Sequence, residues 1–326
     1  MAHESGTEMR IEAAPDGDPV ACNLYSRTIA APQVVLGAGL AAKCIAKQFP
    51  GIALSMSPIA RPSENSFSPT GNWTREQTLL AFQFYCETPF GQLHRQNRKI
   101  VELAQLIGRT PSALAMKCVN LASLDPKIRA SGRAGLSNAS ALDRSIWEEA
   151  HADWGAVIAE CESLLAYLRK EKQLPEPKPI PDEETDYTGE VRTALVKQRI
   201  GQDFFRRSVL SSYGERCCIS GVSDKHFLVA SHIVPWNEDA TIRLHPGNGL
   251  CLSTIHDRAF DKHLFSLTDD HRVILSERLK NAKDDFLRQV FWPTEGRQIA
   301  LPEKFVPETS FIARHRERMT TSGSTP

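Results

Sequence analysis

Three residues in the carboxyl-terminal half of the sequence have types and spacings that suit proton transfer and metal binding. His232 follows the apolar run 227–230, Asn248 lies between two glycines, and His256 follows in a segment with helical character. The two intervals are 16 and 8 residues. A histidine ring changes its charge near neutral pH, so it can take a proton from water, and its neutral form is a common metal ligand. The order predicts a strand ending in one histidine, a loop containing the asparagine, and a helix carrying the second histidine.

Five short blocks of residues surround these three and occur in a fixed order. They are Arg199-x-Gly201-Gln202-x-x-Phe205-Arg206, residues 218–221 (Cys-Ile-Ser-Gly), 230–236 (Ala-Ser-His-Ile-Val-Pro-Trp), 248–252 (Asn-Gly-Leu-Cys-Leu) and 256–261 (His-Asp-Arg-Ala-Phe-Asp). This pattern resembles the HNH endonuclease family, whose core is a ββα-metal motif, and within it the HNH domains of bacterial restriction-like endonucleases. The resemblance implies an α+β fold, with a helical amino-terminal domain followed by a carboxyl-terminal ββα-metal domain.

The resemblance also implies a role for each of the three residues. His232 is the expected general base, since hydrolysis of a phosphodiester needs a water made nucleophilic. Asn248 matches the family asparagine that holds the loop through backbone hydrogen bonds and helps to orient the base. His256 matches the metal-ligand position, with Asp257 as a second candidate ligand. The expected metal is Mg²⁺, with Mn²⁺ or Ni²⁺ as substitutes at a site that contains histidine.

One position departs from the family pattern. Many members have Asp or His directly before the catalytic histidine as a second metal ligand, whereas this sequence has Ser231, a poor ligand. Asp257 and Asp261 are the nearest carboxylates along the chain, and they lie four residues apart on one helix face, offset from the face of His256. The cysteines at 217, 218 and 251 lack the paired spacing of a four-ligand zinc site, so we interpret them as small buried residues.

Residues 72–170 have the pattern of a helical domain. Thr74 and Gln77 form a capping box at the start of one helix. A second helix stops at Gly108, and Thr110 with Pro111 begins a third. A single last helix is expected over 142–170. Helix, short glycine turn and helix is the outline of a helix-turn-helix motif, although a bundle that only packs has the same outline.

Several polar side chains are candidates for contacts with DNA. In the helix-turn-helix interpretation, the third helix of this region would present polar groups to the bases. A helix predicted over 192–213 leads into the nuclease-like segment and carries cationic groups that suit phosphate. The candidate DNA-binding residues are Lys117 and Asn120 on the first of these helices and Arg199, Gln202, Arg206 and Arg207 on the second.

The remaining segments give the domain organisation. Residues 1–71 read as a poorly structured leader, although 34–42 fit the glycine pattern of a dinucleotide-binding turn without the expected second strand or acidic residue. Residues 171–187 form a proline-rich, acidic linker, which favours an extended spacer. The nuclease domain is expected over 188–318, followed by a disordered tail at 319–326.

Composition excludes several classes of protein. Lys and Arg number 39 and balance 39 Asp and Glu, so the chain is not a polybasic, histone-like protein. No apolar run approaches the roughly 18 residues of a membrane-spanning helix, and the first residues lack the order of a secretory signal. Eight cysteines are spread along the chain. Together these features predict a cytoplasmic protein with reduced thiols.

By resemblance, the sequence predicts a metal-dependent endonuclease that hydrolyses phosphodiester bonds of double-stranded DNA, in restriction or antiviral defence. One ββα site cuts one strand at a time, so a clean double-strand cut would imply a homodimer or two successive nicks. One alternative is a DNA-binding regulator with a catalytically inactive HNH scaffold. Another makes the helical domain a protein-interaction or small-ligand sensor.

Overall fold

The computed structural model describes residue 62 and residues 66–132, 138–175 and 189–322. The glycine pattern at 34–42, the final residues 323–326 and most of the proline-rich linker lie outside the described residues. The chain divides into two compact units, Met1–Ile45 and Ala46–Pro326, and all described residues belong to the second.

The amino-terminal part of this unit is helical. The predicted capping box is confirmed, because Thr74 accepts a hydrogen bond from the Gln77 N–H and the Gln77 side chain accepts one from the Thr74 N–H. Thr110 and Pro111 begin the third helix as predicted. Gly108 takes a left-handed backbone, with φ of +75°, between the second and third helices. The elements are α2 (Arg75–Glu87), η1 (Phe90–Gln92), α3 (Arg98–Leu106), α4 (Pro111–Ala122), α5 (Pro126–Ala130), α6 (Ala141–Ala152) and α7 (Trp154–Glu171).

The single helix expected over 142–170 is wrong. Asp153 divides it into α6 and α7, because its backbone is extended, with φ of −153° and ψ of 90°. Its carboxylate accepts a hydrogen bond from the Ala156 N–H at 2.9 Å, which caps the start of α7. A capping Asp satisfies an amide that the helix itself leaves unpaired. The chain therefore turns a corner at residue 153.

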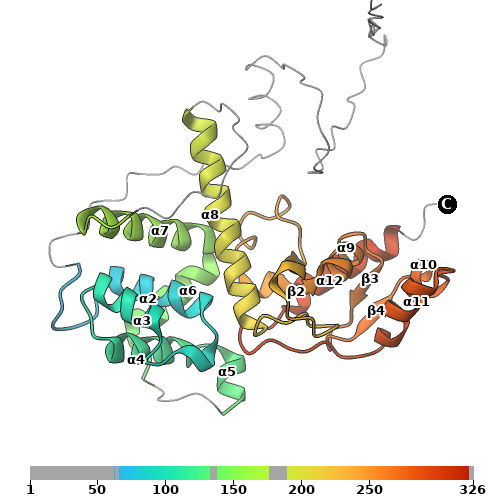
Figure 1. The fold of residues 1–326 in the computed structure, drawn as a ribbon, viewed down its shortest axis with the longest axis horizontal. Coiled ribbons are helices and arrows are strands. Elements are labelled where there is room, and N and C mark those ends of the chain that lie inside the picture. Colours follow the sequence, from blue (N-terminus) through green and yellow to red (C-terminus); the bar gives the residue numbers. More distant parts are fainter. Residues whose placement is uncertain (1–61, 63–65, 133–137, 176–188, 323–326) are drawn as a thin grey trace, which may run out of the picture. The chain divides into compact units, whose positions relative to one another are not determined.

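The carboxyl-terminal part adds two small antiparallel sheets to this α+β fold. Strand β1 pairs with β2, and β3 pairs with β4. The long helix α8 contacts α2 and α7 on one side and β1 and β2 on the other (Figure 1). The elements are α8 (Gly189–Ser212), η2 (Lys225–Phe227), β1 (Leu228–His232), η3 (Pro246–Asn248), β2 (Gly249–Ser253), α9 (Thr254–Asp261), β3 (Phe265–Leu267), β4 (Val273–Leu275), α10 (Glu277–Lys280), α11 (Asp285–Phe291), η4 (Trp292–Thr294) and α12 (Thr309–Ser322).

One hydrophobic core joins the helical and nuclease-like parts. Buried apolar side chains from both belong to a single cluster. Trp154 of α7, which is fully buried, lies 6.2 Å from Phe204 of α8 and 5.8 Å from Phe305, measured between ring centroids. Although the sequence separates these parts at residues 171–187, their described residues pack as one body.

A buried lysine ties the two parts together. The Lys304 ammonium is buried and donates hydrogen bonds to the backbone carbonyls of Tyr85, Cys86 and Thr88 at the end of α2, the last two at 2.8 Å. Helices leave such carbonyls unpaired, and a cation suits the negative end of the helix dipole. The next residue, Phe305, donates its N–H to the Asp125 carboxylate at 3.0 Å.

Among the helices of the described segments, none combines the length and the apolar character needed to cross a bilayer.

Candidate active site

The strands β1 and β2 and the helix α9 form a continuous ββα unit. The pairing sets Ser231 opposite Leu250 and His232 opposite Gly249. Helix α9 begins directly after β2, with Ser253 at its amino-terminal cap, and it contacts both strands. The end of β1 and the exposed side of α9 are thereby brought together.

The His232 ring is fixed by stacking and by one hydrogen bond. Its centroid lies 3.7 Å from that of the Phe205 ring, and the planes are 10° apart. The Nε2 atom is 2.9 Å from the Arg243 backbone carbonyl. A carbonyl only accepts hydrogen bonds, so Nε2 carries the proton and Nδ1 is left to act as a base. Burial lowers the pKa of His232 to about 4, against the opposing effects of the Arg243 carbonyl and the Asp261 charge, so the ring is neutral at pH 7.

Asn248 is fully buried and joins the two ends of the loop that follows His232. Its Oδ1 accepts the Val234 N–H at 2.8 Å, and its Nδ2 donates to the Val234 carbonyl at 3.1 Å and to the Ile242 carbonyl at 3.5 Å. Both the oxygen and the nitrogen of the side-chain amide are therefore engaged in hydrogen bonds to the loop backbone. Asn248 therefore holds the loop and does not face a metal site.

Two glycines of the sequence blocks allow α8 to approach the site closely. A Cβ on Gly249 would lie 2.4 Å from Val209 Cγ2 and 2.8 Å from Phe205 Cζ. A Cβ on Gly201 would lie 3.2 Å from Leu244 Cδ2 in the loop after β1. The absence of side chains at these positions therefore lets α8 carry Phe205 to the face of the His232 ring.

Two carboxylates of α9 share the region of His232. Ser231 makes a side-chain hydrogen bond to Asp257, whose pKa is raised by burial and by the Asp261 charge, against the effect of that bond. Asp261 is exposed and acts electrostatically on both Asp257 and His232. Residues four apart share one face of a helix. Ser231 thus contacts a candidate metal ligand.

His256 lies in the core, on a different side of α9. It is 4% exposed, and its Nδ1 is 2.7 Å from Ser253 Oγ and 4.0 Å from Cys217 Sγ. Its ring packs edge-on against Phe291 at 5.4 Å, and its Nε2 is buried with no hydrogen-bond partner among the described residues. The His256 ring therefore lies in the core, whereas the next residue, Asp257, bonds to Ser231 beside His232.

The donor atoms on α9 were compared with the needs of a divalent metal. Within the described ranges, no group of three or more His, Cys, Asp and Glu side chains is arranged to hold one. Mg²⁺ is commonly held by one or two carboxylates, with waters and substrate phosphate completing its octahedron. Asp257 and Asp261 fit this requirement, whereas a site for Ni²⁺ or Zn²⁺ would call for histidine or cysteine ligands.

The cysteines near the site are buried and form no disulfide. Burial disfavours the charged form of Cys217, but hydrogen bonds with His256 and Ser220 outweigh it and lower its pKa to about 6. Burial raises the pKa of Cys251 to about 12 and that of Cys218 well above its usual value. All three are free and buried, as the sequence indicates.

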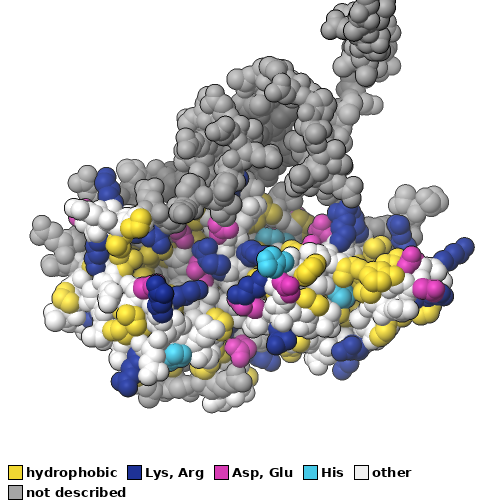
Figure 2. Space-filling model, viewed as in Figure 1, with side chains coloured by type: hydrophobic (Ala, Val, Ile, Leu, Met, Phe, Trp, Pro, Cys, Tyr) yellow, Lys and Arg dark blue, Asp and Glu magenta, His cyan; other side chains and the backbone are white. Residues whose placement is uncertain are grey.

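The candidate DNA-binding residues separate into two groups. Gln202 and Arg206 are exposed on α8, and Arg206 also donates to the Leu228 carbonyl at 3.0 Å. Arg199 lies on the same helix and is exposed. Arg207 is paired with Glu87 at 3.0 Å. On the molecular face drawn in Figure 2, basic and acidic side chains are interspersed rather than gathered into one basic surface.

Of the two candidates in the helical region, Lys117 is buried and Asn120 is half-buried. Lys117 is 5% exposed, and its ammonium is 2.7 Å from the buried Asp143 carboxylate. Asn120 has its Oδ1 buried without a partner among the described groups. The helix-turn-helix interpretation placed Lys117 among the outward polar groups of its helix, but its partner lies on α6. It is not available to a phosphate.

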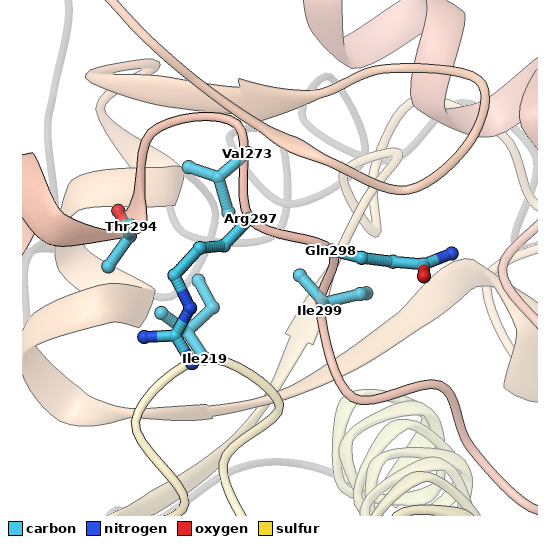
Figure 3. Close-up of a pocket in the computed structure, with 6 residues that line it drawn as sticks. All are labelled: Ile219, Val273, Thr294, Arg297, Gln298 and Ile299. Carbon is cyan, nitrogen blue, oxygen red and sulfur yellow. The ribbon is translucent and has the colours of Figure 1, made fainter.

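A small hollow lies elsewhere in this part of the chain. It is lined by Ile219, Val273, Thr294, Arg297, Gln298 and Ile299 (Figure 3). It has room for about one water molecule, and none of the candidate catalytic, metal-binding or DNA-binding residues lines it. It therefore adds nothing to the candidate site.

Sequence reasoning missed two contacts of His232. Phe205 belongs to a recognised block, so its spacing was a usable signal, but nothing in the block indicates that it stacks on the base. Arg243 acts through its backbone carbonyl. Every residue has this group, so the amino-acid sequence does not reveal the contact. Both contacts depend on the fold of the loop between β1 and β2.

Comparison with known proteins agrees with this architecture. Residues 217–268 match the family model for the HNH endonuclease, and this stretch contains β1, β2, α9 and β3 in order. No curated protein matches the chain. The carboxyl-terminal part of this chain therefore carries a domain of the HNH endonuclease family.

Proposed function

We propose that the chain is a Mg²⁺-dependent endonuclease that cuts double-stranded DNA, with His232 as the general base. The observation that carries this proposal is the neutral His232 ring, whose Nε2 is bound to a carbonyl and whose remaining nitrogen can accept a proton. Nuclease activity on nucleic acid is the activity of the matching family.

In this proposal, His232 Nδ1 takes the proton of the water that attacks phosphorus. Phe205 and the Arg243 carbonyl keep the ring in one orientation. Asp257 and Asp261 are the side chains that would hold the metal, and Ser231 would orient Asp257 through its hydrogen bond. A bound divalent cation supplies charge neutralisation at the phosphate and at the leaving 3′-oxygen. Arg199, Gln202 and Arg206 of α8 are the proposed contacts with the DNA backbone.

The test is cleavage of supercoiled plasmid, methylated and unmethylated, in Mg²⁺, Mn²⁺, Ni²⁺ or EDTA. Wild type is expected to nick or linearise the plasmid with metal and not in EDTA. His232→Ala is expected to lose cleavage, while His226→Ala, at an exposed histidine of η2, retains it. Cleavage by His232→Ala at the wild-type rate would refute the assignment of the base.

The metal ligands are tested with matched carboxylate variants. Asp257→Asn and Asp261→Asn are expected to raise the Mg²⁺ concentration needed for cleavage by about tenfold or more. Asp269→Asn, at an exposed carboxylate paired with Arg316, serves as control. His256→Gln is expected to bind Mg²⁺ as wild type does. Titration of Mn²⁺ by its paramagnetic signal gives the affinity without any need for activity.

Defence against foreign or modified DNA is the role that the resemblance to restriction-type enzymes supports. A preference for one of the two plasmids would identify the modification that is recognised. Nicked product alone would indicate one site acting on one strand, whereas directly formed linear product would indicate a homodimer.

The second candidate is a DNA-binding regulator with an inactive HNH scaffold. Ser231, at a position where many family members have a metal ligand, favours it. It predicts binding of DNA without cleavage in any metal, and no loss of function in His232→Ala.

A further inference from the structure

The loop between β1 and β2 links His232 to the helical part of the chain. It starts directly after His232 and returns at η3, where Asn248 closes it. Near its end, the Arg243 carbonyl accepts the Nε2 hydrogen of His232. The orientation and tautomer of the base therefore depend on where the backbone of residue 243 lies.

The side chains around residue 243 are held by elements of both parts. The Arg243 guanidinium lies over the Trp236 ring at 5.2 Å and is attracted by Asp153. Leu244 is buried and lies against Gly201 of α8. His245 is buried, and its Nδ1 accepts the Gly247 N–H at 2.9 Å, while its Nε2 is 3.3 Å from a Glu308 carboxylate oxygen. A residue held on several sides transmits a displacement because packed interiors do not yield freely.

The His245 ring is seated on the corner between α6 and α7. Its centroid lies 5.2 Å from Trp154 and 5.4 Å from His151, both edge-on. The same corner contains Asp153, whose charge attracts Arg243. His151 lies at the end of α6 and Trp154 at the start of α7, on either side of the extended backbone of Asp153. This interruption of the helix places both rings against His245.

We propose that the α6–α7 corner, formed by His151, Asp153 and Trp154, positions the general base of the nuclease site. The corner holds His245, His245 fixes the backbone at Arg243, and the Arg243 carbonyl fixes His232 in the form with the proton on Nε2. His245 and the corner residues are positioning residues, since none of them contacts His232. This inference rests on the proposed function in naming His232 as the base.

Two variants of His245 separate its ring contacts from its cap. His245→Asn keeps an acceptor for the Gly247 N–H but removes the ring from the corner. His245→Phe keeps an aromatic ring against Trp154 and loses the acceptor. We expect His245→Asn to lower kcat by about tenfold to a hundredfold with little change in KM, and His245→Phe to restore most of the loss. A Phe variant as impaired as the Asn variant would overturn the role of the corner.

The state of His232 gives a readout that does not need cleavage. Nitrogen-15 NMR of the full chain, with the His232 signals assigned through His232→Gln, reports which ring nitrogen carries the proton. Wild type and His245→Phe are expected to show Nε2–H alone, and His245→Asn a mixture of tautomers. His226→Asn is the control and should leave the His232 signals unchanged. Unaltered His232 signals in His245→Asn would refute the inference.

A double-mutant cycle tests whether the corner acts through His245. His151→Ala is expected to lower kcat about threefold alone and to have no further effect in His245→Asn, because coupled residues are not additive. Additive losses would contradict the proposed path. If wild type does not cut DNA, the proposed function fails, but the NMR comparison still decides whether the corner positions His232.

Discussion

Replacing Gly249 with alanine is a direct test of the close contact between β2 and α8. The backbone of Gly249 has φ of −131° and ψ of 145°, which any residue adopts, so the replacement adds no backbone strain. Its Cβ would lie 2.4 Å from Val209 Cγ2 and 2.8 Å from Phe205 Cζ. The first of these separations is about 1 Å short of normal carbon–carbon contact. The helix, the strand or both must therefore move.

The expected cost follows from these distances. Overpacking of a buried site costs about 1–3 kcal/mol, while the reduced freedom of the unfolded chain returns about 0.4–1 kcal/mol for Gly→Ala. Because the new Cβ would overlap two packed side chains at once, we expect an overpacking cost at the upper end of this range. Gly249→Ala should lower the free energy of unfolding by about 2 kcal/mol.

The assay is urea unfolding of four proteins: wild type, Gly249→Ala, Val209→Ala and the double variant. Val209→Ala alone should cost about 2 kcal/mol, through lost burial and a small cavity. In the double variant the new Cβ meets the space left by the valine methyl group. We therefore expect the double variant to be at least about 1 kcal/mol more stable than the sum of the single effects.

Two outcomes would refute this reasoning. Gly249→Ala with wild-type stability would mean that the two elements do not approach as closely as described. Strictly additive losses would mean that the valine methyl is not the obstacle. The same displacement should also press Phe205 against the His232 ring, so cleavage by Gly249→Ala should fall more than its loss of stability explains.

Three further measurements test other features. His232 has a pKa of about 4 and can act as a base only when deprotonated. The value of kcat/KM should therefore persist well below pH 6.5 and fall around pH 4. A profile with its acid midpoint at 6.5 would contradict the buried position of His232. Burial lowers the pKa of His315 to about 3, so its contribution to stability is complete above pH 6.5 and is lost as pH falls toward 3. Between pH 7 and pH 4 this loss is at most about 3 kcal/mol, and His315→Gln should remove it, as seen by urea unfolding at the two pH values. Lys304→Met should lower the free energy of unfolding by about 3 kcal/mol, because it leaves three buried carbonyls without a donor, and an unchanged urea midpoint would show that the ammonium is not needed there.

Local signals in the sequence predicted local structure well. Thr74 with Gln77, and Thr110 with Pro111, begin helices where expected, because a cap is satisfied by residues three positions away. The break at Asp153 was missed although Asp is a favoured cap. The apolar pattern continues across it, so the pattern alone could not reveal a corner.

The order of strand, strand and helix in the ββα unit was predictable. Which side chains of α9 face the core was not. His256 and Asp257 are neighbours, and successive residues on a helix point about 100° apart. One step along α9 therefore separates Asp257, which bonds to Ser231, from His256, which lies in the core. His256 is held in the core by Ser253 and Phe291, and the packing of Phe291 depends on α11, which no motif indicated.

The Lys117 prediction failed for a related reason. The expectation of an outward position came from placing Lys117 on the recognition helix of a helix-turn-helix motif. Its buried partner, Asp143, is the third residue of α6 and also closes the capping box of that helix. Only the packing of α4 against α6 unites the two charges.

The shared core limits how this gene could be rearranged. A fragment encoding residues 189–322 alone would leave the Lys304 ammonium without its three carbonyl partners and would uncover Phe305 and the α2-facing side of α8. Such a fragment could not be transplanted as an independent cassette onto another targeting domain. Recombination within the proline-rich segment would have to carry compensating changes at both ends of the molecule, so the two parts are expected to be inherited together.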